Sequence, residues 1–217
     1  MIKKINVAGI ELDNYNVHES IELFEKLLLK NAFATVQEVV METLLTAKKN
    51  EEVHQAIEQM SLTVIAENEI LTAAGQHSIQ RKHEIENNEF FYQVMKRVGR
   101  NHLKVFLLGD TLEDVQRAET FILEQFADSM IVGGAAMKAC LGESEGIVNE
   151  INACEADIVI SLLPSPEQEQ FLLSHKDKIS AKMWYGTSIN HILAKNHKIR
   201  LWIRKHIGLK RLREYSY

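Results

Sequence analysis

The chain has 217 residues, of which 46% are hydrophobic and 25% are charged, and this composition is typical of a folded globular protein. No apolar run reaches the roughly 18 residues that a membrane-spanning helix needs, and the amino terminus lacks the apolar segment of a signal peptide. The two cysteines, Cys140 and Cys154, lie outside any metal-ligand spacing, so we expect reduced thiols in a cytoplasmic protein.

Charge is unevenly distributed along the chain. The net charge is −5, but residues 195–217 carry eight Lys or Arg and one acidic residue, which gives +7 there and leaves −12 on residues 1–194. We therefore expect a main domain over residues 1–194 and a basic amphipathic C-terminal helix over residues 195–217. A basic segment on an acidic body is typical of a surface that meets an anionic partner.

The first half of the chain alternates short apolar runs with amphipathic segments. Residues 3–7 and 10–12 flank Gly9 and predict a β-hairpin. Residues 18–30 predict a helix, with Asn16 as its candidate cap. Further along, the pattern predicts a strand at 32–36 that runs into a helix, an amphipathic helix at 51–59 and a strand at 62–65.

The second half continues the alternation. Helices are predicted at 89–100, from Thr111 to about 126, and at 143–154, and strands at 103–108, 130–133, 158–163 and 182–185. Regular alternation of strands and helices is typical of a three-layer α/β domain with a central, largely parallel sheet. Trp184 and Tyr185, in the last strand, are either core aromatic residues or bulk that fills a ligand site.

The turn after strand 158–163 holds both prolines of the chain, Pro164 and Pro166. Proline cannot donate to a sheet, so the strand must end there, and proline is favoured at the start of a helix. Gln168 and Glu169 then open that helix. Polar side chains at the carboxyl end of a strand, beside a helix N-terminus, are typical of ligand sites in open α/β sheets.

This stretch resembles the WecG/TagA/CpsF family of bacterial glycosyltransferases. The Pro-x-Gln-Glu core of the family motif occurs at residues 166–169, with Phe171 where the family has Trp and Pro164 where it has Gly. The Leu-Leu-Gly turn at 107–109, the Ile-Val-Gly run at 131–133 and Gly186 also match. The resemblance runs nearly from end to end of the chain.

The resemblance implies an inverting, metal-independent transfer that needs no cofactor. The donor would be a UDP-sugar, typically of N-acetylmannosamine, and the acceptor a sugar on polyprenyl diphosphate. Family members serve the synthesis of teichoic acid or surface polysaccharide. The residues expected to bind substrate are Thr35, Gln37, Gly109, Thr111, Gln168, Glu169 and Gly186.

Two positions depart from the family pattern. The family's proposed base, an Asp, falls on Ala66, which cannot accept a proton, and the candidate catalytic residue is then Glu67. The Arg expected to meet a diphosphate falls on Glu84, a like charge. Three alternatives stay open: a homologue with lost or altered catalysis, an active transferase that uses Glu67, and a non-catalytic binding or scaffold partner of an active relative.

The C-terminal segment indicates membrane contact. Residues 197–215 predict a basic helix with an apolar stripe, which is typical of helices that lie in a membrane interface; a solvated face on a docked helix is the alternative. The expected contact residues are Lys198, Trp202, Arg204, Lys205 and Arg211. We expect peripheral attachment at the inner face of the cell membrane, and a homo-oligomer or a hetero-oligomer with an active relative is possible. No nucleic-acid reader motif and no metal-ligand spacing accompany these features.

Overall fold

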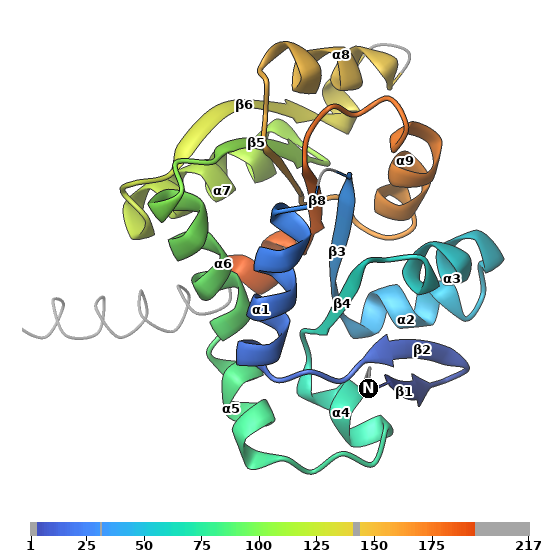
Figure 1. Ribbon diagram of the computed structural model, residues 1–217. Coiled ribbons are helices and arrows are strands. Elements are labelled where there is room, and N and C mark those ends of the chain that lie inside the picture. The colour runs from blue at the N-terminus through green and yellow to red at the C-terminus, as the bar shows by residue number, and fades with distance from the viewer. Residues whose placement is uncertain (1–3, 31, 141–143, 194–217) are drawn as a thin grey trace, which may run out of the picture.

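A computed structural model describes residues 4–30, 32–140 and 144–193. Within these ranges the centre of the molecule is a sheet of six parallel strands in the order β4-β3-β8-β7-β5-β6 (Figure 1). The strands are β3 Ala34–Val39, β4 Leu62–Ile65, β5 Lys104–Gly109, β6 Met130–Ala136, β7 Ile158–Ser161 and β8 Met183–Gly186. Strands inside such a sheet are covered on both faces, which explains why they are continuous apolar runs.

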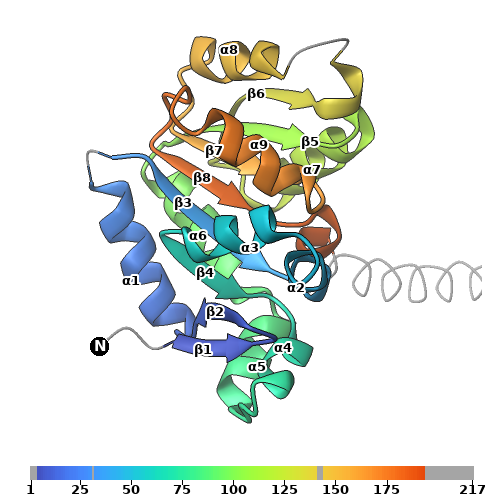
Figure 2. The same cartoon turned by 90° about the vertical axis from the view of Figure 1, so that its right-hand side faces the viewer.

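Helices cover both faces of this sheet (Figures 1 and 2). The core on one face is formed with α1 (Val17–Leu28), α6 (Glu89–Arg100) and α7 (Leu112–Gln125). The core on the other face is formed with α8 (Glu145–Ala153) and α9 (Glu167–His175), and α3 (Glu51–Glu58) packs beside α9. The predicted three-layer α/β fold with a parallel sheet is confirmed.

The predicted hairpin is also confirmed, as β1 (Lys4–Val7) paired with β2 (Ile10–Asp13). Ala8 and Gly9 form its turn with positive φ angles of 55° and 96°, as tight hairpin turns require. Asp13 fixes the hairpin to β4, because its buried carboxylate accepts hydrogen bonds from the backbone N–H and the hydroxyl of Thr63 at 2.9 and 3.1 Å. Asn16 then begins α1 with a capping box.

Trp184 and Tyr185 belong to the core. They are neighbours on β8, both are fully buried, and they point to opposite faces of the sheet. Trp184 stacks on Phe171 of α9 with ring centroids 5.6 Å apart, and Tyr185 stacks on Phe91 of α6 at 6.3 Å. Of the two alternatives for these rings, the core role is confirmed.

The structure differs from the predicted elements at the end of β3. The strand runs to Val39, three residues beyond its predicted end, and α2 (Met41–Ala47) follows directly. The polar pair Gln37 and Glu38 indicated a helix start, but both side chains are buried within the strand. The helices α4 (Asn68–Ala73) and α5 (Ile79–Glu86) were not predicted. α4 has only six residues, and α5 has no apolar stripe, because the one side chain that it buries is that of Glu84.

The predictions for residues 195–217, including the membrane-contact residues Lys198, Trp202, Arg204, Lys205 and Arg211, lie outside the described residues. The domain boundary at residue 194 therefore stays a prediction. In the part of the chain that the structure describes, no helix is long and apolar enough to cross a membrane. Cys140 and Cys154 are both free thiols.

Candidate functional site

Polar side chains gather at the carboxyl ends of the central strands. Gln37 and Glu38 lie near the end of β3, Thr187 follows β8, and Gln168 and Glu169 lie in the first turn of α9 after β7. Each of these residues is at most 3% exposed. Parallel strands end at the same edge of a sheet, and β3, β8 and β7 are neighbours in that order. The strand order therefore brings these segments together, although they are far apart in the sequence.

Gly186 lies between two glutamine side chains. A Cβ atom built on Gly186 would lie 2.2 Å from Oε1 of Gln37 and 3.0 Å from Cδ of Gln168. Only glycine leaves room there, so the two amide groups meet over the backbone of residue 186. Within the described residues, neither Oε1 of Gln37 nor Oε1 of Gln168 has a hydrogen-bond partner, although both atoms are buried.

Glu169 adds a buried carboxylate to this side of the sheet. Its Oε2 accepts a hydrogen bond from the Ser165 hydroxyl at 2.8 Å, and its buried Oε1 has no partner among the described residues. Burial raises the pKa of Glu169, and the hydrogen bond from Ser165 works against that rise. Three buried side-chain oxygens here thus lack a donor with good hydrogen-bond geometry, although the Gln168 side chain and the backbone N–H of residue 169 lie near the Glu169 carboxylate. Buried polar atoms in folded proteins are seldom left unpaired.

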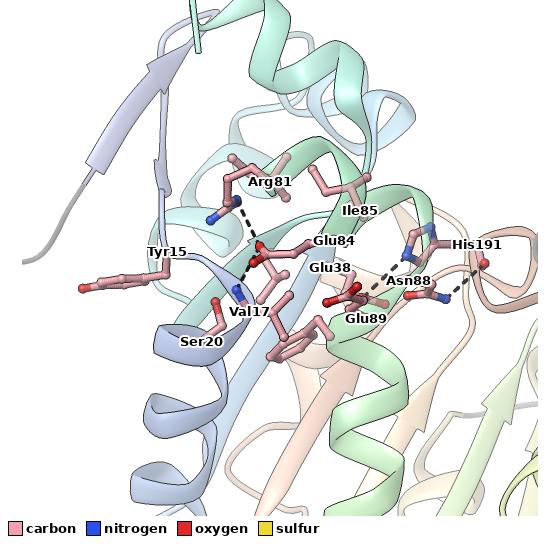
Figure 3. Close-up of a pocket in the computed structure, with 14 residues that line it drawn as sticks. Tyr15, Val17, Ser20, Glu38, Arg81, Glu84, Ile85, Asn88, Glu89 and His191 are labelled. Carbon is pink, nitrogen blue, oxygen red and sulfur yellow. Dashed lines mark hydrogen bonds and ion pairs between the residues drawn. The ribbon is translucent and has the colours of Figure 1, made fainter. Parts of the chain in front are cut away.

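The opposite face of the same strand ends carries an acid–base pair. Successive strand residues point to opposite faces, so Glu38 faces away from Gln37. Oε2 of Glu38 accepts a hydrogen bond from the Thr187 hydroxyl at 2.5 Å, and Nε2 of His191 lies 3.6 Å from Oε1 (Figure 3). Asn88 donates a hydrogen bond to the backbone oxygen of His191 at 3.3 Å.

Glu38 and His191 line a small pocket that opens to the solvent. Its walls come from the start of α1, the end of β4, α5 and the start of α6 (Figure 3). Arg81 on α5 contributes a cation to the pocket; burial lowers the pKa of this guanidinium, and the Glu84 carboxylate opposes that change. The pocket therefore combines three carboxylates, from Glu38, Glu84 and Glu89, with an imidazole and a guanidinium, which suits a polar ligand.

A family model described as "Glycosyl transferase WecG/TagA/CpsF family" matches residues 5–208. The chain belongs to this family. Two curated relatives are both named N-acetylglucosaminyldiphosphoundecaprenol N-acetyl-beta-D-mannosaminyltransferase. The one from Staphylococcus aureus strain NCTC 8325 is 23% identical over 192 residues, and the one from strain MRSA252 is 25% identical over 191. Each alignment covers 84% of this chain and 72% of the relative.

The structure brings together three of the substrate-binding residues expected from the WecG/TagA/CpsF resemblance. Gln37, Gly186 and Gln168 are in contact, and Glu169 follows Gln168 on the first turn of α9. Each side chain is held by a different element of the fold, so the arrangement depends on the sheet topology. Their role in binding stays a prediction.

Thr35 is not part of this group. It is the second residue of β3, at the amino end of the sheet, where its hydroxyl accepts a hydrogen bond from the backbone N–H of Ser61 at 3.1 Å. The prediction that Thr35 lies at the end of its strand is wrong, because β3 continues to Val39. Sequence spacing put the strand end too early.

Gly109 and Thr111 lie at the end of β5, as expected, and both have structural contacts. A Cβ on Gly109 would lie 2.8 Å from a methyl group of Val115, so glycine lets α7 pack closely against β5. The Thr111 hydroxyl caps α7 by accepting from the N–H of Asp114 at 3.2 Å. The neighbouring Asp110 has a cationic partner. Lys138 donates a hydrogen bond to its carboxylate at 2.5 Å, and this hydrogen bond raises the pKa of Lys138.

Ala66 and Glu67, at the end of β4, have separate surroundings. Ala66 lines the pocket with a methyl group, which cannot take part in proton transfer. Oε2 of Glu67 accepts a hydrogen bond from the backbone N–H of Met41 at 2.7 Å, so this carboxylate holds the start of α2. Glu67 is not among the residues that line the pocket, and its role as a base stays a prediction.

Glu84 is tied to the start of α1. Its Oε2 accepts a hydrogen bond from the backbone N–H of Val17 at 3.1 Å, and Arg81 lies 3.9 Å away (Figure 3). Its Oε1 accepts a hydrogen bond from Gln80 at 2.8 Å. A carboxylate at a helix N-terminus satisfies otherwise unpaired N–H groups. The structure thus provides a local reason for Glu84 that is independent of any phosphate.

Sequence reasoning missed Glu38, His191 and Lys138 as site residues. A usable signal for Glu38 was the polar pair at 37–38 inside an otherwise apolar run. The predicted strand stopped at residue 36, so this pair was left outside it. His191 lies in the helical segment at 189–193, just after β8. Its proximity to Glu38 follows from the pairing of β3 with β8, which no local pattern reveals.

Proposed function

We propose that this chain binds a UDP-sugar at the edge formed by Gln37, Gly186 and Gln168 and transfers the sugar to an acceptor linked to polyprenyl diphosphate. Membership of the WecG/TagA/CpsF family supports this, since the two curated relatives are named for transfer of N-acetylmannosamine to N-acetylglucosaminyl-diphosphoundecaprenol. UDP-N-acetylmannosamine is therefore the donor to test first. The transfer would take place at the inner face of the cell membrane, where the lipid acceptor lies.

The observation that carries the proposal is the set of unpaired buried oxygens on Gln37, Gln168 and Glu169. Leaving a buried polar group unpaired costs about 1–3 kcal/mol, so a ligand that supplies donors there gains binding free energy. An N-acetylated sugar offers hydroxyl and amide N–H donors of this kind. A phosphate offers none when it is ionised, and the Glu169 carboxylate would repel it.

The diphosphate needs cations or N–H groups, which lie elsewhere in the structure. Lys138, beside Asp110 at the ends of β5 and β6, and the backbone N–H groups at the start of α7 can serve this purpose. On this arrangement the sugar lies over Gly186, and the diphosphate extends along the strand ends toward Gly109 and Thr111. The charge that develops on departing UDP would be stabilised there.

Calorimetric titration with UDP and with UDP-N-acetylmannosamine tests the donor site. The wild-type chain is expected to bind both at micromolar concentration, and Gln168→Ala to bind the sugar nucleotide at least about tenfold more weakly, a loss of about 1.4 kcal/mol. Gln170→Ala is the matched control, because Gln170 is exposed on the same helix. No heat from folded wild-type protein at millimolar ligand would contradict the proposal.

A non-catalytic binding protein is the second candidate. The observation that favours it is the methyl group of Ala66 in the pocket, where a titratable side chain could otherwise stand. A transfer assay with UDP-N-acetylmannosamine and lipid-linked N-acetylglucosaminyl diphosphate separates the two. Binding of the donor without any product would establish the binding protein, whereas product formation would establish the transferase.

A further inference from the structure

Glu169 is a fully buried carboxylate at the start of α9. Its exposed fraction is 0%, and burial raises its pKa because the ionised form is removed from water. Among the described residues, the charged side chain that acts on it is Glu167, another carboxylate, which raises the pKa further. An uncharged side chain of the same size would avoid this cost, so the reason for a carboxylate at this position has to lie in the groups that it contacts.

Two neighbouring side chains oppose the effect of burial on Glu169. The Ser165 hydroxyl donates a hydrogen bond to Oε2 at 2.8 Å, and this hydrogen bond lowers the pKa of the carboxyl group. The side-chain amide of Gln168 lies near the same carboxylate and acts in the same direction. An amide stabilises an ionised carboxylate with its N–H end, since the carboxylate has no proton to donate. The NH2 end of Gln168 is therefore directed toward Glu169.

The oxygen end of the Gln168 amide faces the proposed donor site. Oε1 of Gln168 lies 3.0 Å from the position of a Cβ atom on Gly186, and Oε1 of Gln37 lies 2.2 Å from the same position. Nε2 of Gln37 donates to the backbone oxygen of Glu38 at 3.5 Å, so this amide too keeps its oxygen toward the site. The two ends of an amide are nearly alike in shape. Packing alone would not decide which end of Gln168 meets Gly186, whereas the carboxylate of Glu169 does.

We propose that Glu169 is a positioning residue for Gln168, which it holds with the carbonyl oxygen toward Gly186, and that Ser165 holds Glu169 in turn. The inference rests on the proposed donor site. A sugar that donates hydrogen bonds is then favoured over one that only accepts them, because an acceptor opposite the glutamine oxygens would leave them unpaired in a buried site. Selection for a donating group, such as the N–H of an N-acetyl substituent, thus depends on a carboxylate that acts through Gln168.

Calorimetry on the full chain compares the binding of UDP with that of UDP-N-acetylmannosamine. Glu169→Gln keeps the size of the side chain, but its amide can donate as well as accept, so Gln168 is no longer held in one orientation. We expect the affinity for UDP-N-acetylmannosamine to fall about tenfold, the equivalent of one hydrogen bond, with the affinity for UDP unchanged. In a Gln168→Ala background the same substitution should cause no further loss, because Glu169 then has no amide to position.

Glu167→Gln is the matched control, because Glu167 is exposed on the same turn of α9 and the substitution removes the same charge. Both affinities should stay at their wild-type values. Urea unfolding at neutral pH distinguishes positioning from a purely structural role. Glu169→Gln removes a buried charge and should not lower the free energy of unfolding, whereas loss of a structural carboxylate would lower stability and affinity together.

The possible results separate this inference from the proposed function. An unchanged affinity of Glu169→Gln for UDP-N-acetylmannosamine, an equal loss for UDP, a loss that adds fully to that of Gln168→Ala, or a joint loss of stability would overturn the positioning role while the donor site stands. Wild-type protein that binds UDP-N-acetylmannosamine no more tightly than UDP would overturn the proposed sugar contact, and this inference with it.

Discussion

Gly186 shows at the scale of one residue how the proposed donor site is built. Gly186→Ala would place a methyl group 2.2 Å from Oε1 of Gln37 and 3.0 Å from Cδ of Gln168. Both amide ends would have to move, so we expect UDP-N-acetylmannosamine binding to fall at least about tenfold, or 1.4 kcal/mol, with a stability loss of about 1–3 kcal/mol from overpacking. Calorimetry and thermal unfolding measure the two effects.

Gly146→Ala provides the control for this substitution, because nothing lies within 4 Å of a Cβ atom on Gly146. Gly146→Ala should leave UDP-N-acetylmannosamine binding unchanged and should not lower the free energy of unfolding. Undiminished binding by Gly186→Ala would show that the two glutamine side chains do not contact the donor.

The buried carboxylate of Glu169 predicts a pH dependence of stability. Its pKa is raised by burial in the folded state but is about 4.3 in an unfolded chain, so the folded state holds the proton more tightly. Stability is then greatest below the unfolded pKa and falls as the pH rises through the folded pKa. Glu169→Gln removes this ionisation, and its stability relative to wild type should increase over that pH range.

Urea unfolding of both proteins from pH 4 to 8 measures this difference. Glu150→Gln on α8 serves as the control, because Glu150 is exposed and its replacement should leave the pH profile of the wild type intact. A constant difference between Glu169→Gln and wild type at all pH values would contradict the assigned pKa direction.

At the scale of elements, apolar periodicity located much of the fold. The strand at 62–65 and the helix at 89–100 have the bounds that the pattern predicted, because each has a clear apolar period and a polar boundary. β3 was misjudged because its two buried polar residues, Gln37 and Glu38, contradict the expectation of an apolar strand. Buried polar residues are frequent at ligand sites, so the error fell at residues that we propose to be functional.

The start of α1 depends on Glu84, which makes this carboxylate a stabilising group. Glu84→Ala would leave the largely buried Arg81 guanidinium with the Glu19 carboxylate alone and the Val17 N–H without its acceptor. Breaking a buried ion pair from one side costs about 3–5 kcal/mol, so we expect a clear loss of stability in urea unfolding, with less loss for Glu84→Gln.

Glu86→Ala, on the exposed side of α5, is the control and should change stability by within about 0.5–1 kcal/mol. If Glu84 instead acts mainly by repelling a diphosphate, Glu84→Ala would tighten UDP binding and leave stability unchanged. The two measurements therefore separate a structural role from an electrostatic one.

At the scale of the whole molecule, the uneven charge predicts how the chain meets a membrane. Each Lys or Arg near an anionic surface contributes about 1 kcal/mol of attraction, and residues 195–217 carry a net charge of +7. The full chain should sediment with vesicles that contain phosphatidylglycerol and not with purely zwitterionic ones. Reversal of Lys205 and Arg211 to Glu should weaken this binding at least about tenfold, by the same arithmetic.

The matched control reverses Lys48 and Lys49, which are exposed on the main domain, and should leave vesicle binding nearly unchanged. Added salt should weaken the wild-type interaction, since exposed charges are screened. Equal binding to both kinds of vesicle would contradict an electrostatic attachment.

The whole-molecule topology also explains which part of the site was out of reach of sequence reasoning. Gln37, Gly186 and Gln168 could be named from local turns and from the family resemblance. The contact of Thr187 with Glu38 joins residues 149 positions apart, and it exists because β8 inserts beside β3. Only the order of strands in the sheet turns these separate residues into neighbours.

The alternation at the end of β3 restricts how this strand can change in length. Gln37 and Glu38 are consecutive yet serve opposite faces, one toward the amide cluster and the other toward His191. Inserting or deleting one residue ahead of them would turn the amide side chain toward the face with His191 and the carboxylate toward the face with Gln168. A change of two residues would keep each side chain on its own face. Variation in this segment among functional descendants of the chain, natural or engineered, should therefore come in even steps.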